Sequence, residues 1–496
     1  MRVLLRCDGG PKIGVGHVVR SLALAHVALG RGHSVDLLGR IEGALLESLI
    51  AGTAGLTVLG TPDRGRALAE VAGGYDVLHL DHYELGTEVL ADVVAAVGHD
   101  RPLLSSMADG RFGARPADML VDPTVGAERD DPPAAAHWHL RGSRFTPVRG
   151  DARPGSAPAA DGPLTVLVVM GGTDPTGCAP LVVEALAQVG APLDVTVVSV
   201  AETAEQLASL GETWTSGRLR VTAPVPDLLA RMAAADVVVT AAGTSTWEVC
   251  ALGRPMALVA AVDNQRTGHD RVVAAGGAIG LGGPGDLADV QATTARLRPL
   301  LTDNAVRDRV ARAAHRLVDG LGAWRVVSAW EAARTAGEPR AVSPAVAVRP
   351  ATLQDAEALW HWRNDSLTRA MSRHQGTVPF DDHLSWLRAS VDRPDRHLLV
   401  GTAGGVEVGT VRWDLESGAE WEVSITLAPE ARGRGVAPGL LRAGEIWLSR
   451  TTVVDAYLAV VRTDNLASRR LFLHGGYAPD LPANGEGFER WVRTVR

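Results

Sequence analysis

The sequence of 496 residues is poor in cysteine, has no excess of positive charge and contains no long apolar run. Its three cysteines, Cys7, Cys178 and Cys250, lie far apart, so neither a disulfide framework nor a zinc site is predicted. We expect no metal requirement. The formal net charge of −8 argues against a nucleic-acid partner, because binding a phosphate backbone needs concentrated Lys and Arg.

No apolar run approaches the roughly 20 residues that a helix needs to cross a bilayer, so no membrane partner is predicted. After Met1 and Arg2 the chain enters a short apolar strand, without the features of a signal peptide. Together with the sparse cysteines, this predicts a cytoplasmic location. The sequence leaves the oligomeric state open.

The length exceeds what one hydrophobic core usually supports and predicts about three domains. From residue 1 to about 150, short apolar strands alternate with helical stretches, the pattern of a parallel sheet wound with helices. Residues 150–161, rich in Gly, Pro, Ala and Asp, are predicted to be a linker. The expected strands include Ser34–Leu38, Val77–Asp81 and Met119–Asp122.

A second alternation of strands and helices follows this linker. Two doubly wound sheets in series would place ligand-binding loops at their strand ends, across a cleft from each other. The amphipathic segment 304–336 is long enough to reach back over the first domain. The expected strands are Leu164–Met170, Asp194–Val200, Arg218–Thr222, Asp236–Ala241 and Met256–Ala260.

The last part of the chain has a different pattern. Strands Leu398–Gly401 and Val406–Trp413 follow one another with Gly404-Gly405 between them, which is typical of an antiparallel hairpin. The predicted fold class is therefore α/β, with two doubly wound Rossmann-like domains, followed by an α+β domain. The predicted boundaries are 1–155 and 156–336 for the first two domains, 337–345 for a linker and 346–496 for the third domain.

The loop Gly14-Val15-Gly16-His17 follows an apolar strand and opens a helix. Its glycines let the backbone approach a ligand, and a helix that begins there points its amides at an anion. A phosphate site needs no imidazole, whereas a site that moves a proton near pH 7 gains from one. His17 is thus a candidate base, the alternative being a surface histidine beside a packing turn.

Two further glycine loops end strands of the second domain, at 171–174 and 241–246. The first is predicted to hold a diphosphate and the second to form an anion site at a helix N-terminus. Glu248, about one turn into that helix, can accept hydrogen bonds from ribose hydroxyls. Either loop alone is better explained by a tight strand-to-helix turn, but two of them facing His17 are harder to explain in this way.

Several motifs of the first 335 residues, in this order, resemble the UDP-sugar hydrolases of pseudaminic acid biosynthesis. The resemblance implies a two-lobed GT-B fold and the cleavage of UDP from UDP-2,4-diacetamido-2,4,6-trideoxy-β-L-altrose, with water as acceptor. The motifs are Gly14-x-Gly16-His17-x-x-Arg20, Asp81-His82-Tyr83, Gly171-Gly172-Thr173-Asp174, Ala241-Ala242-Gly243-Thr244-Ser245-Thr246-Trp247-Glu248, Asp263-Asn264-Gln265 and Asp319-Gly320-Leu-Gly322.

The resemblance also implies roles for single residues. His17 matches the base that takes a proton from the attacking water, and Tyr83 and Asn264 match positions that face the sugar. Glu248 matches the ribose contact, and Val225 lies in the loop that reads the uracil edge. The other predicted substrate-binding residues are Gly14, Gly16, Arg20, Gly171, Gly172, Thr173, Gly243, Thr244, Ser245 and Gln265.

Two acidic positions qualify this interpretation. Asp8, near the mouth of the expected cleft, is predicted to raise the basicity of His17 by pairing with it. Where many relatives carry two acidic residues, this chain has Met107-Ala108-Asp109, with one. The sugar specificity therefore stays open, and a glycosyltransferase would use the same nucleotide loops.

The third domain carries Arg432-Gly433-Arg434-Gly435-Val436-Ala437 between a predicted strand and a predicted helix. This loop resembles the pyrophosphate loop of the GNAT acetyltransferases, and two further runs, Trp362–Asp365 and Asn465–Tyr477, match other motifs of that family. The resemblance implies acetyl-CoA as co-substrate, held by residues 432–437 and by Asn465.

The implied reaction is direct transfer of an acetyl group to an amine. Glu422 is the candidate base, the alternative being a solvated strand carboxylate. Phe472 stands where many members of the family have a tyrosine acid, so water or His474 would have to serve. The two halves together predict a bifunctional enzyme that acetylates an amino sugar and hydrolyses a UDP-sugar. The alternatives are a glycosyltransferase fused to a tailoring acetyltransferase, and a nucleotide-sugar sensor fused to a protein N-acetyltransferase.

Overall fold

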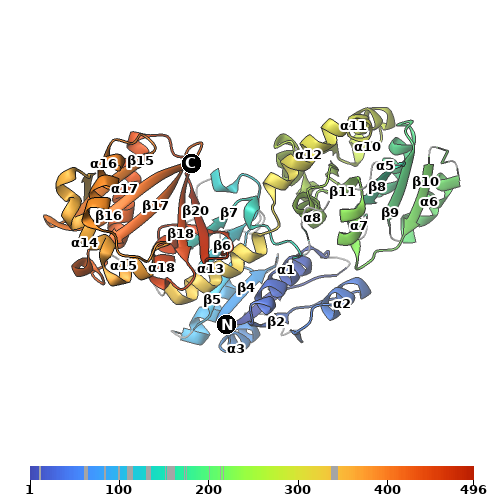
Figure 1. The fold of residues 1–496 in the computed structure, drawn as a ribbon. Helices are drawn as coiled ribbons and strands as arrows, with labels where there is room; N and C mark the ends of the chain where they lie inside the picture. Colours follow the sequence, from blue (N-terminus) through green and yellow to red (C-terminus); the bar gives the residue numbers. More distant parts are fainter. Residues whose placement is uncertain are drawn as a thin grey trace. The chain divides into compact units, whose positions relative to one another are not determined.

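The fold is shown in Figure 1 as a computed structural model. The chain forms two compact units, Met1–Val327 and Ser328–Arg496. Among the described residues, no helix combines the length and the apolar character that crossing a membrane requires. The structure describes residues 1–10, 13–60, 65–82, 85–98, 101–108, 116–129, 136–150, 152, 162–171, 174, 176–199, 201–212, 214–215, 217–336 and 344–495.

The first unit begins with a parallel sheet of seven strands in the order β3-β2-β1-β4-β5-β6-β7. Its inner strands are apolar and almost wholly buried, as expected when helices cover both faces of a parallel sheet. The strands are β1 (Arg2–Cys7), β2 (Ser34–Leu38), β3 (Leu56–Leu59), β4 (Val77–Asp81), β5 (Leu103–Met107), β6 (Met119–Asp122) and β7 (Trp138–Arg141), and the helices are α1 (Gly16–Gly30), α2 (Ala44–Ala51), α3 (Gly65–Ala72) and α4 (Thr87–Val97).

A second parallel sheet follows, with six strands in the order β10-β9-β8-β11-β12-β13. Side chains of β8 alternate between two cores, Val166 and Val168 on one face, Leu167 and Val169 on the other. The strands are β8 (Leu164–Val169), β9 (Leu193–Val198), β10 (Gly217–Thr222), β11 (Val237–Ala241), β12 (Met256–Val259) and β13 (Ile279–Gly282). The helices are α5 (Cys178–Ala187), α6 (Ala201–Glu212), α7 (Leu228–Ala234), α8 (Thr244–Leu252), α9 (Arg266–Ala274), α10 (Pro284–Leu287), α11 (Val290–Thr302), α12 (Asn304–Leu317) and α13 (Gly322–Ala336).

Both sheets reverse their strand order beside their first strand, between β1 and β4 in one and between β8 and β11 in the other. In a doubly wound sheet this reversal opens a crevice at the carboxyl ends of the strands, where ligands bind. The two sheets confirm the predicted pair of Rossmann-like domains. Each predicted glycine loop follows a strand that borders one of these reversals.

The segment predicted to reach back over the first domain does so through the start of α13. Arg325 is 1% exposed, and its Nη1 donates to the carbonyl oxygen of Arg144 at 2.7 Å. The guanidinium of Arg31 lies 5.1 Å from the ring centre of Trp324. Asp319 accepts two hydrogen bonds from Arg325, which fixes the turn before the helix.

The second unit contains a mixed sheet in the order β14-β15-β16-β17-β18-β20-β19. The predicted hairpin is confirmed, since Gly404 and Gly405 have φ of 59° and 80° between antiparallel β15 and β16. The strands are β14 (Ala347–Pro350), β15 (Arg396–Ala403), β16 (Val406–Ser417), β17 (Glu420–Leu427), β18 (Ala456–Arg462), β19 (Ala478–Leu481) and β20 (Phe488–Thr494), and the helices are α14 (Ala356–Asn364), α15 (Ser366–Ala370), α16 (Phe380–Val391), α17 (Ala437–Thr451) and α18 (Leu466–His474).

Strands β17 and β18 run parallel but separate part of the way along. Their pairing ends at Val423 and Ala459, although β17 continues to Leu427. Helix α17 packs closely on one face of the sheet, where an added Cβ on Gly444 would lie 2.8 Å from Val411. Helices α14 and α16 contact the sheet from β15 to β17. The unpaired ends of β17 and β18 leave an opening in the sheet, which is a candidate place for a ligand.

Candidate functional site

The first candidate centre is a buried cluster of His17, Arg20 and Asp81. The Nδ1 atom of His17 lies 2.7 Å from Oδ1 of Asp81, and Arg20 donates to both Asp81 oxygens, from Nε at 2.9 Å and from Nη2 at 2.8 Å. The three residues are 4%, 9% and 1% exposed. Burial alone would raise the pKa of Asp81, but the charge of Arg20 and the hydrogen bond with His17 hold it well below its ordinary value.

The fold explains why these residues meet. His17 and Arg20 lie in the first turn of α1, which follows β1, and Asp81 is the last residue of β4. Strands β1 and β4 are parallel neighbours, with Cys7 paired to Asp81. The cluster thus lies at the carboxyl edge of the first sheet, at its strand-order reversal. The predicted ligand contacts of His17 and Arg20 stay predictions.

The predicted pairing of Asp8 with His17 is wrong. Asp8 is bonded instead to Arg6, to Nε2 of His82 at 2.7 Å and to the amide of Arg40 at 2.8 Å. Although burial opposes the charged form, the hydrogen bonds from His82 and Arg6 keep the pKa of Asp8 well below its usual range. The partner of His17 is Asp81, because that residue ends the neighbouring strand β4.

Two helix N-termini without a side-chain cap meet beside His17. Helix α1 begins at Gly16 and helix α8 at Thr244, and neither cap residue, Val15 or Gly243, supplies a side-chain hydrogen bond. They approach so closely that a Cβ on Gly16 would lie 2.6 Å from Oγ1 of Thr244. Amides at such helix ends attract an anion, so this junction is a candidate anion site.

The glycine loop after β8 is less suited to a diphosphate than predicted. The carboxylate of Asp174 accepts from the amides of Cys178 at 2.9 Å and Ala179 at 3.0 Å, and so caps α5 itself. Gly171 has φ of 81° and marks the turn after the strand. The remaining residues of this motif, Gly172 and Thr173, lie outside the described residues, as do Tyr83 and Asp109.

The predicted ribose contact is engaged in an ion pair. Glu248 is 2% exposed, and its Oε1 accepts from Nε of Arg149 at 2.6 Å. Its predicted role would have to use the other carboxylate oxygen. Gln265 borders the loop after β11, where its Nε2 would lie 3.6 Å from a Cβ on Gly243.

The remaining residues predicted to bind the sugar nucleotide lie at the edges of the second sheet. Asn264 is exposed in the short helical turn Asp263–Gln265 that follows β12. Val225 lies half-buried between β10 and α7, and Ser245 lies half-buried in the first turn of α8. Gly14, with φ of 90°, closes a small loop through hydrogen bonds with Gly10. Their predicted ligand contacts stay predictions.

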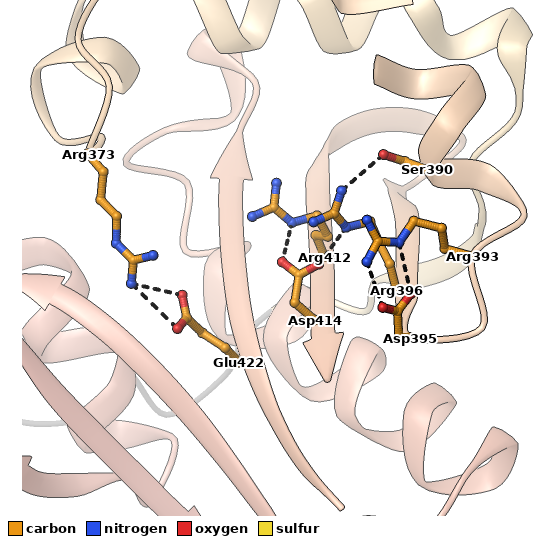
Figure 2. Close-up of polar contacts among 8 residues, drawn as sticks. All are labelled: Arg373, Ser390, Arg393, Asp395, Arg396, Arg412, Asp414 and Glu422. Carbon is orange, nitrogen blue, oxygen red and sulfur yellow. Dashed lines mark hydrogen bonds and ion pairs between the residues drawn. The ribbon is translucent and has the colours of Figure 1, made fainter. Parts of the chain in front are cut away.

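The second candidate centre lies on β17 of the C-terminal unit. Glu422 stands one residue before the pairing with β18 ends, and Nη2 of Arg373 lies 3.3 Å from its Oε1 (Figure 2). Burial raises the pKa of Glu422, and the charge of Arg373 partly opposes this rise. A carboxylate with a raised pKa beside an opening in the sheet suits a base for an ammonium group.

The predicted pyrophosphate loop has the backbone of an anion-binding turn. Gly433 and Gly435 have φ of 73° and 76°, and Ala437 is the first residue of α17. Alternating conformations of this kind turn successive amides to one side. The side chain of Arg432, however, donates to Asp365 at 2.6 Å and to Thr368 at 2.9 Å. It links the loop to α15. Arg434 is exposed, and Val436 is buried as the cap residue of α17.

Two further predicted residues of this centre have structural partners. Asn465 caps α18, since its Oδ1 accepts from the amide of Ser468 at 3.1 Å. Phe472 is buried against Tyr477, with 5.0 Å between the ring centres. Tyr477 donates to Glu445 at 2.8 Å, and burial raises its pKa well above the ordinary value. Tyr477 is therefore unsuited to replace the missing acid.

Sequence reasoning missed Asp81 and Arg373 as partners of the two candidate bases. Asp81 has a signal in the sequence, a carboxylate at the end of the strand predicted at Val77–Asp81. Arg373 has none, because it lies in the segment between α15 and α16, 49 positions before Glu422. Among the described residues, no group of three His, Cys, Asp or Glu side chains is placed to hold a metal ion.

Comparisons with known proteins found one family match and a number of similar solved structures. Residues 346–478 match the sequence model of a family described as acetyltransferase (GNAT) domain. No curated protein matched the chain. One similar solved structure is spermidine N-acetyltransferase from Vibrio cholerae in complex with CoA and spermine, with 16% identity over 30% of this chain and 95% of that chain and a TM-score of 0.28. A second is aminoglycoside acetyltransferase AAC(6')-Ib in complex with coenzyme A, with 18% identity over 30% of this chain and 95% of that chain and a TM-score of 0.28. A third is MurG from Acinetobacter baumannii, with 17% identity over 66% of this chain and 99% of that chain and a TM-score of 0.48. The family match identifies residues 346–478 as a GNAT acetyltransferase domain.

Proposed function

We propose that this chain is a bifunctional nucleotide-sugar enzyme. Its first unit hydrolyses a UDP-diacetamido-trideoxy-sugar to UDP and free sugar, and its GNAT domain transfers an acetyl group from acetyl-CoA to an amine of an amino sugar. The observation that carries the hydrolase proposal is the His17–Asp81 pair beside two uncapped helix N-termini. A base and an anion site side by side are what hydrolysis of a sugar diphosphate requires.

In the hydrolase step, His17 acts through Nε2. When Nδ1–H donates to Asp81, the lone pair of the ring lies on Nε2, which takes a proton from water. The water oxygen forms a bond to the anomeric carbon, and the bond from that carbon to the diphosphate oxygen breaks. The electron pair leaves with UDP, whose added charge is stabilised by the amides at the start of α8. Asp81 then balances the imidazolium.

In the acetyl transfer, Glu422 accepts the proton of the substrate ammonium. The amine nitrogen forms a bond to the thioester carbonyl carbon and the carbon–sulfur bond breaks, while the proton that the nitrogen loses on becoming an amide passes to the departing thiolate, which leaves as CoA. The loop from Gly433 to Ala437 and the N-terminus of α17 would hold the CoA pyrophosphate. If the amine is that of a UDP-linked sugar, the two centres catalyse consecutive steps, acetylation and then release of UDP.

The test supplies purified full-length protein with UDP-4-amino-4,6-dideoxy-β-L-AltNAc and acetyl-CoA in H₂¹⁸O, and analyses the products by mass spectrometry. We expect CoA, UDP and a diacetamido sugar that carries ¹⁸O at the anomeric position. His17→Asn should keep UDP binding and CoA release but lose UDP release by about 10²- to 10⁴-fold, the usual worth of a general base. His26→Asn is the matched control, because His26 is an exposed residue of the same helix.

Two outcomes would overturn the hydrolase. Release of UDP only after a second sugar is added would indicate a glycosyltransferase. UDP binding without turnover in the unaltered protein would indicate a nucleotide-sugar sensor. A GNAT domain that releases CoA with a protein N-terminus and with none of the amino sugars would overturn the proposed acetyl acceptor.

A further inference from the structure

One face of the C-terminal sheet carries a row of charged side chains at the candidate acetylation centre (Figure 2). Asp414 on β16 lies directly opposite Glu422 on β17 in the antiparallel register. Arg396 and Arg412 both donate from Nε to the single carboxylate of Asp414. The indole of Trp386 on α16 lies 5.9 Å from each of these two guanidinium groups. The row thus faces α16, on the side opposite to α17.

The arginine that pairs with Glu422 comes from outside the sheet. Arg373 lies in the segment between α15 and α16, and its side chain is 53% exposed. Hydrogen bonds from α14 fix this segment. Nδ2 of Asn364 donates to the carbonyl of Val378 at 2.9 Å and its Oδ1 accepts from the amide of Val378 at 2.8 Å, while Arg363 donates to the carbonyl of His374 at 2.7 Å. The backbone that follows Arg373 is therefore anchored, but its side chain is not enclosed.

The guanidinium of Arg373 occupies the position that an acceptor ammonium needs. Its Nη2 lies 3.3 Å and 3.5 Å from the two oxygens of Glu422, a loose ion pair that is longer than a strong charge-assisted hydrogen bond of about 2.7–2.9 Å. An ammonium must reach the same oxygens to give up its proton, so it competes with Arg373 for them and is repelled by its charge. An amine that approaches Glu422 must therefore displace Arg373, which the exposed side chain allows.

Displacement leaves the charged row with an excess of cations. Asp414 is already shared by Arg396 and Arg412, so it offers little to a displaced Arg373. The next carboxylate along β16, Glu416, is solvent-exposed at the end of the strand and is screened by water. With the ammonium bound, three guanidinium groups and one ammonium face two partly buried carboxylates. An anionic group on the acceptor itself would balance this charge.

We propose that Arg373 selects acceptors that carry a phosphate group near the amine: the ammonium replaces its guanidinium on Glu422, and the released guanidinium binds the phosphate. This inference rests on the proposed acetyl transfer. It makes Arg373 a specificity-determining residue that disfavours simple amines and favours phosphorylated ones, such as an amino sugar that still bears its nucleotide diphosphate.

The test compares two amines that differ only by a phosphate, O-phosphoethanolamine and ethanolamine, and then a UDP-linked amino sugar and the same sugar without UDP. The measured quantity is kcat/KM for CoA release at saturating acetyl-CoA. We expect the unaltered protein to prefer each phosphorylated acceptor by about 10- to 100-fold, the worth of one charge-assisted contact. In Arg373→Met this preference should vanish, because activity falls on the phosphorylated acceptor and holds or rises on the simple amine.

Arg393→Met is the matched control. Arg393 is similarly exposed and pairs with Asp395, two residues away, at 2.6 Å (Figure 2). Arg393→Met should leave the preference for the phosphorylated acceptors unchanged, and circular dichroism should show that both variants keep the native fold. Glu422→Gln should lower activity on both amines of a pair alike.

The outcomes separate this inference from the function on which it rests. An unchanged preference in Arg373→Met, or an equal loss on both amines of a pair, overturns the role of Arg373 and leaves acetyl transfer to the sugar standing. Acetylation of phosphoethanolamine in an Arg373-dependent manner, without acetylation of any amino sugar, supports the role of Arg373 and overturns the sugar acceptor. Absence of CoA release with every amine overturns both.

Discussion

Nδ1 of His17 and Oδ1 of Asp81, 64 positions apart in the chain, lie 2.7 Å from each other at the end of two adjacent parallel strands. The strand-order reversal between β1 and β4 brings them together, since it places the first turn of α1 beside the last residue of β4. A carboxylate on Nδ1 orients the ring and leaves Nε2 for proton transfer. The same reversal in the second sheet places the start of α8 at the corresponding edge.

Asp81→Asn is expected to lower both activity and stability. The asparagine cannot balance an imidazolium on His17, so UDP release should fall by about 10²- to 10⁴-fold. It also leaves the buried guanidinium of Arg20 without its charge partner, which should lower the free energy of unfolding by about 3–5 kcal/mol. Urea unfolding at pH 7 measures this cost.

The double variant Arg20→Met/Asp81→Asn is the control for the stability effect. The double variant lacks the guanidinium of Arg20, whose uncompensated charge destabilises Asp81→Asn. It should therefore be more stable than Asp81→Asn alone. Its UDP release should stay low. If the double variant lost as much stability as the two single variants together, this would contradict the buried ion pair. If the double variant kept full turnover, this would show that His17 does not need Asp81.

Gly16 is expected to tolerate no side chain while α1 and α8 are in contact. A Cβ at this position would lie 2.6 Å from Oγ1 of Thr244, closer than non-bonded atoms approach. Gly16→Ala should therefore push the two helix ends apart and raise the KM for the UDP-sugar several-fold. Thr244→Ala should have a smaller effect, and adding it to Gly16→Ala should recover part of the loss. Gly14→Ala at the other glycine of the loop tests strain, because no atom of the described residues lies within 4 Å of its Cβ position and its φ is 90°.

The fold could be predicted from the sequence because the ends of the strands are recognisable in it. The strands predicted at Ser34–Leu38, Val77–Asp81 and Met119–Asp122 are present with the same ends, since each is a short apolar run between turn residues. The side-chain partners were harder to predict. Whether His17 pairs with Asp8 or Asp81 depends on strand order and side-chain direction, which periodicity does not contain.

Capping also changed the interpretation of the glycine loops. Two strand–glycine–helix motifs of the second sheet look alike in sequence, yet Asp174 caps α5, whereas the cap residue of α8, Gly243, supplies no side-chain hydrogen bond. An aspartate shortly before a helix is a recognisable capping signal, so this difference was available in principle. The Arg373–Glu422 pair was not, because nothing in the local sequence around Arg373 indicates which strand it faces.

His79 is expected to make stability depend on pH. Burial lowers its pKa from 6.5 to about 4, so the folded protein keeps this ring neutral while the unfolded chain takes up a proton near pH 6.5. Between these values the unfolded state binds more protons. Stability therefore falls as the pH drops from about 6.5 to 4, by up to about 3 kcal/mol for this group.

Unfolding by urea between pH 7 and 4.5 measures the effect. His79→Gln should show a shallower fall than the unaltered protein over this range, although it loses stability at pH 7. His26→Gln, at an exposed position, should keep the original slope. Equal slopes for His79→Gln and the unaltered protein would contradict a buried neutral ring.

Arg432 and Asp365 are expected to act on cofactor binding through one contact. Arg432 donates to Asp365 at 2.6 Å, and Asp365 accepts from the amide of Thr368, so the pyrophosphate loop is tied to the start of α15. The hydrogen bond from Arg432 also keeps the pKa of Asp365 low, which keeps the pair charged at neutral pH. Without the contact between Arg432 and Asp365, binding of the cofactor itself must order the pyrophosphate loop.

Arg432→Met and Asp365→Asn should therefore each raise the KM for acetyl-CoA by about tenfold, the worth of one charge-assisted hydrogen bond, with kcat little changed. Arg462→Met, which removes an exposed pair with Asp464, should leave the KM unchanged. The double variant decides how Arg432 acts. If it is no worse than either single variant, Arg432 acts only through Asp365. If the two losses add, the guanidinium contacts the cofactor phosphates directly, because its effect then survives the removal of its partner.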